Sequence, residues 1–470
     1  MKLRCDREHR ECHELSGVEY MATRKRTPNP ALADLLDQAR WTRTQLAQQV
    51  NRLGPQAGLH LTYDRTAVAH WIAGTPPKPE VRPLILEALS ARLGRPVTHE
   101  EAGLVPASST EGARSVDTVE ELIDLGRADM DPSRRKLLAT ATLFSAALSV
   151  PAFQQTARAA DGTASPAKAI SRIGPSQVTA VRAMTERIAD ILDELGAGHA
   201  RPMAAAFLVN TVGPWLRADA TEPVRRDMLA AASDLTYLTG WMAMYEKAHG
   251  LGQTYYTKAL KLADEAGDHA TYCRTLRGMS LQASSLGHGR MALELADSAA
   301  EAAPSAGPRL VAFLRGQQAH AASMVGDRNQ AHSRLREAES ALARADNRRD
   351  AVGGYDQTAY LFHVSHVLME EGDHAGSIKA LKHSIRVQAP QERQGRVHAY
   401  ATLAQRQLRH GHLDASCDSW GRFLDEYEHV ASVRGDEHFA TMRRDLAPHA
   451  KVRAVKELAG RAREVSAAKA

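Results

Sequence analysis

Aromatic residues, cysteines and long apolar runs are all scarce in this 470-residue sequence. Aromatic side chains make up 5% of the chain, whereas hydrophobic residues as a whole make up 43%. Because alanine is plentiful and β-branched runs are few, the composition favours an all-α protein whose helices pack closely through small side chains. The length allows two or three domains, each with its own core.

The four cysteines are Cys5, Cys12, Cys273 and Cys417. A secreted disulfide scaffold would contain more, so the count fits a reducing cytoplasm. Cys5 and Cys12 lie close to His9 and His13 in the sequence, but a structural zinc site usually needs two ligand pairs brought together by a fold, so we expect no metal there. Met21 precedes a basic run and is an alternative start, and residues 1–28 are expected to be a disordered leader.

One apolar stretch, which ends at Phe153, follows Arg134 and Arg135. Paired arginines, an apolar core and the small residues beyond it are the parts of a twin-arginine export signal. A signal belongs at the N-terminus, however, and this run is short and rich in Ala, Ser and Thr for a membrane span. We therefore expect an interdomain helix over 134–153, inside a linker over 107–172. An exported or membrane-tethered protein that starts at Met130 is the alternative.

Sequence signatures of catalysis are lacking as well. We find no glycine-rich phosphate loop, nucleophile elbow, HExxH motif or convincing carboxylate pair, and we expect neither enzymatic activity nor a cofactor. The chain has 21 histidines, and His363 and His366 lie one helical turn apart. Without a third ligand nearby, such a pair is more typical of surface or groove-lining histidines than of a metal site.

Positive charge is concentrated near the N-terminus. The chain carries a net charge of +5 at pH 7, and eleven basic against seven acidic residues between Arg24 and Glu101 contribute +4 of it. The total is too small to prove a nucleic-acid partner, but its distribution favours one. The basic arm 24–26 could lie along phosphates.

Capping residues divide the segment 29–106 into short helices. Asn29 precedes a proline at a first helical position, Thr42 begins a second helix, and Asp64 begins a third helix that Gly74 closes. A fourth helix is expected after the proline-rich turn that follows.

Thr98, with Glu101 three residues later, predicts a short fifth helix.

Short helices that meet at turns are compatible with a DNA-binding helix-turn-helix, in which the outward residues of one helix reach base edges in the major groove. Small Ala67 and Ala69 would let that helix sit deep, and Arg65 can donate to guanine. The predicted DNA-binding residues are Arg43, Thr44, Gln45, Arg65, Thr66, Ala67, Ala69, His70 and Lys78.

The sequence DRTAVAHWIAG at 64–74, with Leu46-Ala47 before it and Pro77-Lys78-Pro79 after it, resembles the helix-turn-helix of the Cro/repressor-like class. More narrowly, it resembles actinobacterial (Streptomyces-type) regulators, in which a Trp and a Gly close the recognition helix before a proline-rich turn. The segment 54–63 is long for a tight turn, so docking on DNA is expected to differ from the compact pattern.

Small residues recur in register within 173–445. From Gly252 the corresponding positions are Ala292, Ala331, Ser377 and Ser416, at spacings of 40, 39, 46 and 39 residues. Each small residue is expected to let the second helix of a hairpin approach the first, after a glycine at which the chain turns. A strict tetratricopeptide unit has about 34 residues, so we predict a longer, tetratricopeptide-like α-solenoid with a concave groove.

Other segments complete this region. A long helix is predicted over 176–195, with Met184 and Leu195 among its inward residues, and residues 446–470 are predicted to form a helical tail. The sequence ALKLADEAGD at 259–268 resembles the same actinobacterial regulators. Aromatic and basic side chains could line the groove, although packing in the core is an alternative role for half of them. The predicted partner-binding residues are Tyr255, Tyr256, Arg274, Arg277, Tyr360, His363 and Arg396.

The resemblance implies a cytoplasmic transcriptional regulator of development, sporulation and secondary metabolism, antibiotic production included. Its head would bind DNA, and its repeats would bind a peptide or protein and set the activity or a homodimeric state; a membrane is not an expected partner. The step from repeats to a peptide signal is an analogy between folds. The alternative is an interaction scaffold that does not bind DNA.

Overall fold

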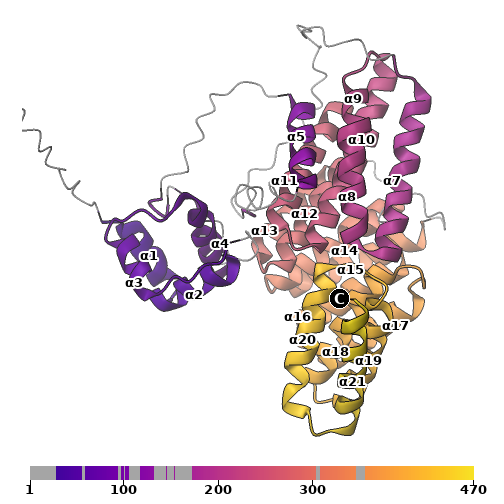
Figure 1. Ribbon diagram of the computed structural model, residues 1–470. Coiled ribbons are helices and arrows are strands. Elements are labelled where there is room, and N and C mark those ends of the chain that lie inside the picture. Colours follow the sequence, from indigo (N-terminus) through magenta and orange to yellow (C-terminus); the bar gives the residue numbers. More distant parts are fainter. Residues whose placement is uncertain are drawn as a thin grey trace, which may run out of the picture.

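The computed structural model describes residues 28–54, 59–93, 97–99, 101–104, 117–131, 144–145, 153, 172–302, 307–345 and 355–469. Within these residues all regular secondary structure is helical, which confirms the all-α class. A small helical unit, here called the head (28–104), lies beside a long stack of helices, here called the array (172–469) (Figure 1).

The described elements of the head are α1 (Pro30–Gln38), α2 (Arg43–Leu53), α3 (Arg65–Ile72), η2 (Pro79–Val81) and α4 (Arg82–Leu93). The three predicted caps are confirmed, because the side chains of Asn29, Thr42 and Asp64 each accept a hydrogen bond from the first turn of their helix. The apolar faces of all four α-helices meet in one core. Burial of these leucines and valines against one another holds the short helices together.

The predicted fifth helix at Thr98 is wrong. Thr98 Oγ1 does accept a hydrogen bond from the Glu101 backbone at 3.1 Å, but residues 101–103 form a turn. The Asn29 side chain donates to the Ala102 carbonyl at 2.9 Å. The segment therefore folds back onto the first helix cap instead of continuing as a helix.

The helices of the array run in hairpins from the middle of the chain to its C-terminal region. They are α7 (Pro175–Leu195), α8 (Ala197–Phe207), η3 (Leu208–Val212), α9 (Gly213–Leu216), α10 (Glu222–Tyr245), α11 (His249–Ala266), α12 (His269–Ser285), α13 (Gly289–Glu301), α14 (Pro308–Met324), α15 (Arg328–Ala343), α16 (Gln357–Glu370), α17 (His374–Val387), α18 (Arg393–Arg409), α19 (Leu413–Tyr427), α20 (Val433–Leu446) and α21 (Arg453–Ala468). The five pairs from α10–α11 to α18–α19 pack as hairpins. This arrangement confirms a tetratricopeptide-like repeat array.

The predicted small residues mark the contact between the two helices of each hairpin. Each has a small partner twelve residues earlier, and the buried pairs are Gly240–Gly252, Ser280–Ala292, Ala319–Ala331, Ser365–Ser377 and Ala404–Ser416. In the last two pairs the hydroxyl of the second residue donates to the backbone carbonyl of the first at 2.8 Å. Small side chains are needed because the two backbones approach so closely.

The expectation that a glycine turns the chain holds in the later hairpins but is wrong in the first. Gly326 and Gly372 lie between helices with φ of 83° and 85°. Gly240 and Gly252, by contrast, lie inside α10 and α11. The turn between these two helices contains Lys247 with φ 60° instead.

Replacement of Gly240 by alanine is expected to lower the free energy of unfolding by about 1–3 kcal/mol. A Cβ at this position would lie 2.9 Å from a ring carbon of Tyr256 and 3.0 Å from the Gly252 carbonyl oxygen, so α10 and α11 would have to separate. The matched control is Gly421→Ala in α19, where the nearest atom is the end of Arg461 at 3.7 Å. Chemical denaturation should show a loss for the first variant and a gain of up to about 1 kcal/mol for the control.

The long helix predicted over 176–195 is confirmed as α7. Val178, Val181 and Leu192 face the core as expected. Met184 and Leu195 do not, because they are 40% and 46% exposed. The inward stripe of α7 is therefore narrower than its apolar residues suggest.

The linker over 107–172 contains a described helix that lies before residues 134–153. Helix α5 (Thr118–Met130) packs against α8, α9 and α11. Most of the apolar helix predicted over 134–153 lies outside the described residues, but Phe144 and Ser145 are described and are not helical. Ser145 exchanges two hydrogen bonds with the Gln253 side chain of α11, at 2.8 and 2.9 Å.

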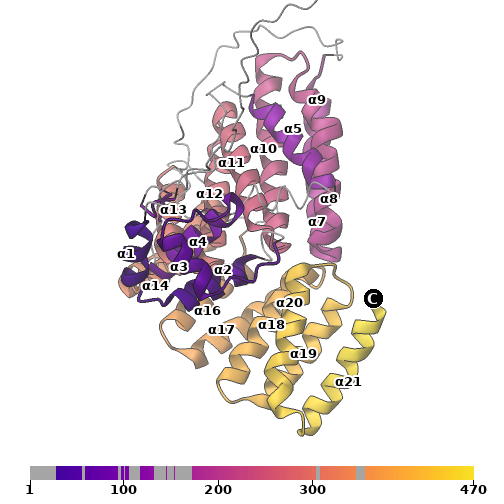
Figure 2. The ribbon, with the colours of Figure 1, turned by 60° about the vertical axis from the view of Figure 1, so that its left-hand side comes forward.

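The two ends of the array contact each other, a closure that the prediction of an α-solenoid with a concave groove did not include. The backbone of Ala431, before α20, accepts from Gly198 at 3.0 Å and donates to Leu195 at 2.8 Å. Lys247, after α10, pairs with Glu437 in α20 at 2.8 Å. The start of the array thus touches its last helices, as the lower end of α7 beside α20 illustrates (Figure 2). At the far end, α21 covers α19.

None of the described helices has both the length and the apolar character needed to cross a membrane.

Candidate functional site

The predicted DNA-binding residues of α3 form an outward face on the head. Arg65, Thr66 and His70 are exposed, and Ala67 and Ala69 are partly exposed. These residues are exposed with the array in place, so the array does not cover this face. Two small residues flanked by longer polar ones give a profile that can enter a groove of DNA.

The start of α2 and the turn after α3 extend this face. Arg43, Thr44 and Lys78 are exposed. Gln45 is exposed too, but its side-chain oxygen accepts from the Thr42 backbone at 2.8 Å in a capping box. This bond uses the oxygen of Gln45, and the amide N–H groups of its side chain can donate to a phosphate.

The connection between α2 and α3 is long, as predicted, and its end is fixed to α2. The side chain of Asn51 donates to the Tyr63 carbonyl at 2.7 Å and accepts from the Tyr63 backbone at 2.8 Å. The ring of Tyr63 packs edge-on against Trp71, with centroids 5.1 Å apart. These contacts set the angle of α3 although residues 55–58 lie outside the described part.

The head touches the array through α4, on the side away from α3 (Figure 1). Glu87 in α4 pairs with His288, which lies in the turn between α12 and α13. Phe144 of the linker stacks on the same histidine, with ring centroids 5.4 Å apart. Docking through α4 leaves the outward face of α3 free.

Tyr255 and Tyr256 are not accessible to a partner, contrary to their predicted role. Both are fully buried in α11. The hydroxyl of Tyr255 donates to Asp129 of α5 at 3.1 Å, and Asp129 also pairs with Arg201 of α8. Burial, and then the nearby Asp129, raises the pKa of Tyr255 well above its usual value. Tyr255 thus joins the linker helix to the array.

The two predicted arginines of α12 have different surroundings. Arg274 pairs with Asp234 at 2.6 Å. The guanidinium of Arg277 lies 4.0 Å from the ring centre of Phe313 and 5.4 Å from that of Trp241. It is buried, and its Nε and Nη1 atoms have no hydrogen-bond partner.

Tyr360 and His363 of α16 are also buried, not surface groups lining an open groove. His363 is hydrogen-bonded to the Tyr355 hydroxyl at 3.0 Å, and Gly316 of α14 leaves the room for this pair. Burial, and then the charge of Arg277, holds the pKa of His363 well below its usual value. Among the described residues no group of three or more His, Cys, Asp or Glu is arranged to hold a metal ion.

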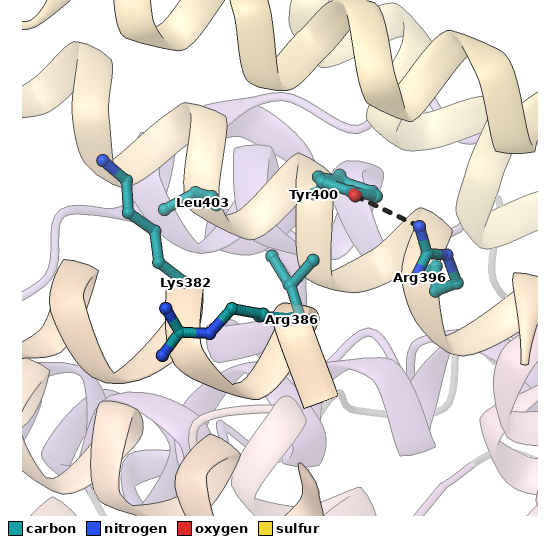
Figure 3. Close-up of a pocket in the computed structure, with 6 residues that line it drawn as sticks. Lys382, Arg386, Arg396, Tyr400 and Leu403 are labelled. Carbon is teal, nitrogen blue, oxygen red and sulfur yellow. Dashed lines mark hydrogen bonds between the residues drawn. The ribbon is translucent and has the colours of Figure 1, made fainter. Parts of the chain in front are cut away.

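Arg396 lines an open pocket between α17 and α18. The pocket has a volume of about 390 Å³, and its other lining residues are Lys382, Ile385, Arg386, Tyr400 and Leu403 (Figure 3). Arg396 donates to Glu426 at 2.7 Å and to the Tyr400 hydroxyl at 3.2 Å. Lys382 and Arg386 remain exposed at the rim. A basic rim beside an apolar floor can receive an acidic, partly apolar peptide.

Apart from His366, which belongs to the histidine pair noted in the sequence, sequence reasoning missed the residues on the inner side of the array. The residues that directly follow the small residue of each first helix are Trp241, Leu281, His320, His366 and Gln405. His320 and His366 are close, with ring centroids 4.6 Å apart. The register of the small residues contained this signal, because a fixed offset from a contact residue defines one side of every repeat.

Comparison with known proteins gives a partial match. Residues 32–105 match a family model described as the SP15 N-terminal domain. No curated protein matches the chain. Among solved structures, a monomeric mutant of IFIT1 with m7Gppp-AAAA is similar at 14% identity and a TM-score of 0.34, over 93% of this chain and 98% of that one. The family match thus covers the head and does not extend to the array.

Proposed function

We propose that this protein is a cytoplasmic transcriptional regulator whose head binds DNA and whose array binds a peptide or protein partner. The exposed face of α3 carries the proposal, since Arg65, Thr66 and His70 stay exposed while the head is docked through α4. Helix α3 packs against α2, as a recognition helix does against its supporting helix. The net charge of +4 between Arg24 and Glu101 supports contact with phosphates.

The pocket at Arg396 supports the second half of the proposal. Its lining combines basic and apolar side chains from two helices, and a short acidic segment of a partner would fit that chemistry. The resemblance to actinobacterial regulators suggests target genes of differentiation or antibiotic production. Partner binding at the array would then set the activity or the oligomeric state of the head.

The combined variant Arg65→Ala, Thr66→Ala is expected to bind its DNA sites roughly 10-fold to 100-fold more weakly than the wild type. Genomic pull-down with the intact protein would define the sites, and gel shifts would give the affinities. Arg336→Ala is the matched control, because Arg336 is exposed on α15 of the array. If no sites are enriched, or if the head variant binds as well as this control, DNA binding by α3 is refuted.

The second candidate function is an interaction scaffold, which the pocket at Arg396 favours. Salt dependence separates the two functions. Phosphate contacts weaken steeply as salt rises, and each lost contact lowers the slope of log affinity against log salt by about one. Peptide affinity at the pocket without any salt-dependent DNA affinity would favour the scaffold.

A further inference from the structure

The closed array surrounds an interior that is lined by the first helices of its hairpins. Successive first helices contact one another directly, α10 with α12, α12 with α14 and α14 with α16. Tyr245, His366, His398 and Arg434 lie deep in the molecule. Each of these residues is nevertheless partly exposed to solvent. The interior therefore contains room that protein atoms do not fill.

Among the described residues, no acidic side chain pairs with Arg277 in this interior. The polar groups that act on Arg277 are tyrosines, of which Tyr237 and Tyr256 are the strongest. Its Nε and Nη1 atoms are buried and donate to nothing, although these nitrogens carry three N–H bonds between them. A buried charge without a partner is costly, and proteins normally pair such groups.

Neighbouring histidines repeat the pattern. Nδ1 of His320 and Nε2 of His366 are buried without a hydrogen-bond partner. The rings of Phe313 and Trp241 lie next to the Arg277 guanidinium. On α14, Gln317 is one helical turn after Phe313, and His320 is one helical turn after Gln317. Nitrogens without a hydrogen-bond partner thus come from α12, α14 and α16, and the rings of Phe313 and Trp241 lie beside the guanidinium of Arg277.

We propose that this interior binds a compact anionic ligand whose carboxylate or phosphate group pairs with Arg277. An anion would accept from the free N–H groups and neutralise the guanidinium, while Phe313 and Trp241 would contact a flat apolar part of the ligand. The short distances from the guanidinium to Phe313 and Trp241 suit a compact ligand. This inference names a ligand class for the array and so rests on its proposed role in binding.

The test uses the full chain and three probes of similar shape, namely benzoate, phenyl phosphate and benzyl alcohol. We expect an anionic probe at about a hundredfold excess over its Kd to raise the wild-type melting temperature by about 5 °C, and the neutral alcohol to have no such effect. A response to benzoate alone identifies a carboxylate site, and a response to phenyl phosphate alone identifies a phosphate site.

Arg277→Met should abolish this response. Its ligand-free melting temperature should equal or exceed that of the wild type, because the variant removes an unpaired buried charge; a residue with only a structural role would give a drop. Arg277→Lys keeps the charge and should retain a weaker response. Arg336→Met, which removes an exposed charge on α15, should respond like the wild type.

Two results would overturn the proposal. One is that the wild-type chain responds equally to the charged and neutral probes, or to none of them, whatever the variants do. The other is that Arg277→Met responds as the wild type does. These measurements contain no DNA, so failure of DNA binding in gel shifts leaves them unaffected.

Discussion

As the pH falls from 7 to 5, three buried histidines are expected to lower the free energy of unfolding of the array by about 6 kcal/mol, which is comparable to the whole stability of many domains. Burial, and then Lys247, lowers the pKa of His249 to about 3, and burial, and then Arg277, lowers that of His320 to about 4. The pKa of His363 is shifted in the same direction.

The sign follows from the lowered values. Below the ordinary histidine pKa of 6.5 the unfolded chain takes up a proton at each of these positions, whereas the folded chain does not until the pH reaches the lowered value. Each histidine therefore costs about 1.4 kcal/mol per pH unit as the pH falls through this window, and three of them cost about 4 kcal/mol per unit.

Thermal unfolding followed by circular dichroism at pH 7.5, 6.5, 5.5 and 4.5 would measure this dependence. His320→Gln should reduce the slope of stability against pH by about 1.4 kcal/mol per pH unit, which is the contribution of one histidine. His383→Gln is the control, because His383 is exposed on α17. A flat profile down to pH 4.5, or the same slope in both variants, would contradict the assignment of the acid sensitivity to the interior.

Replacement of Asp129 by alanine is expected to cost about 3–5 kcal/mol and to lower the melting temperature by on the order of 10 °C. Asp129 is 2% exposed and accepts from Arg201 and from the Tyr255 hydroxyl. The variant leaves the buried guanidinium of Arg201 without its counter-ion. It also removes one of the polar contacts that join α5 to the array, namely the one shared with α8 and α11.

A second substitution distinguishes the charge effect from simple loss of packing. The double variant Asp129→Leu, Arg201→Met removes both charges and should recover more than half of the lost stability. Asp124→Ala is the control on the same helix, because its exposed pair with Arg127 should contribute less than about 1 kcal/mol. If the double variant is as unstable as the single one, the lost stability does not come from the unpaired charge of Arg201.

The helices of the head and the register of the repeats could be predicted because their signals are local. A capping side chain such as Asp64 bonds to its own helix, and a glycine at a turn or a small residue such as Ser377 serves its own hairpin. The same logic misled at Thr98, where the cap bond forms but the chain folds back onto Asn29, 73 residues away from Ala102. The local cap bond at Thr98 formed as predicted, but the distant contact with Asn29 kept the chain from continuing as a helix.

The roles of the aromatic and basic residues of the array could not be predicted in the same way. The first helices are enclosed on several sides, so hydrophobic periodicity does not distinguish a core side from an interior side. Tyr255 and Arg277 belong to the same class of candidate by sequence. Only the fold separates them, because α5 covers the first while the second faces the interior.

By itself, then, the sequence determined an all-α chain, a capped helical head with an outward basic face, and hairpins with small residues in register. Tertiary structure alone decided that the array closes and that polar residues such as Arg277 and His363 are buried inside it. The physical reason is distance along the chain. Closure depends on backbone bonds from Ala431 to Leu195 and Gly198, and no pattern within one repeat specifies contacts between segments so far apart.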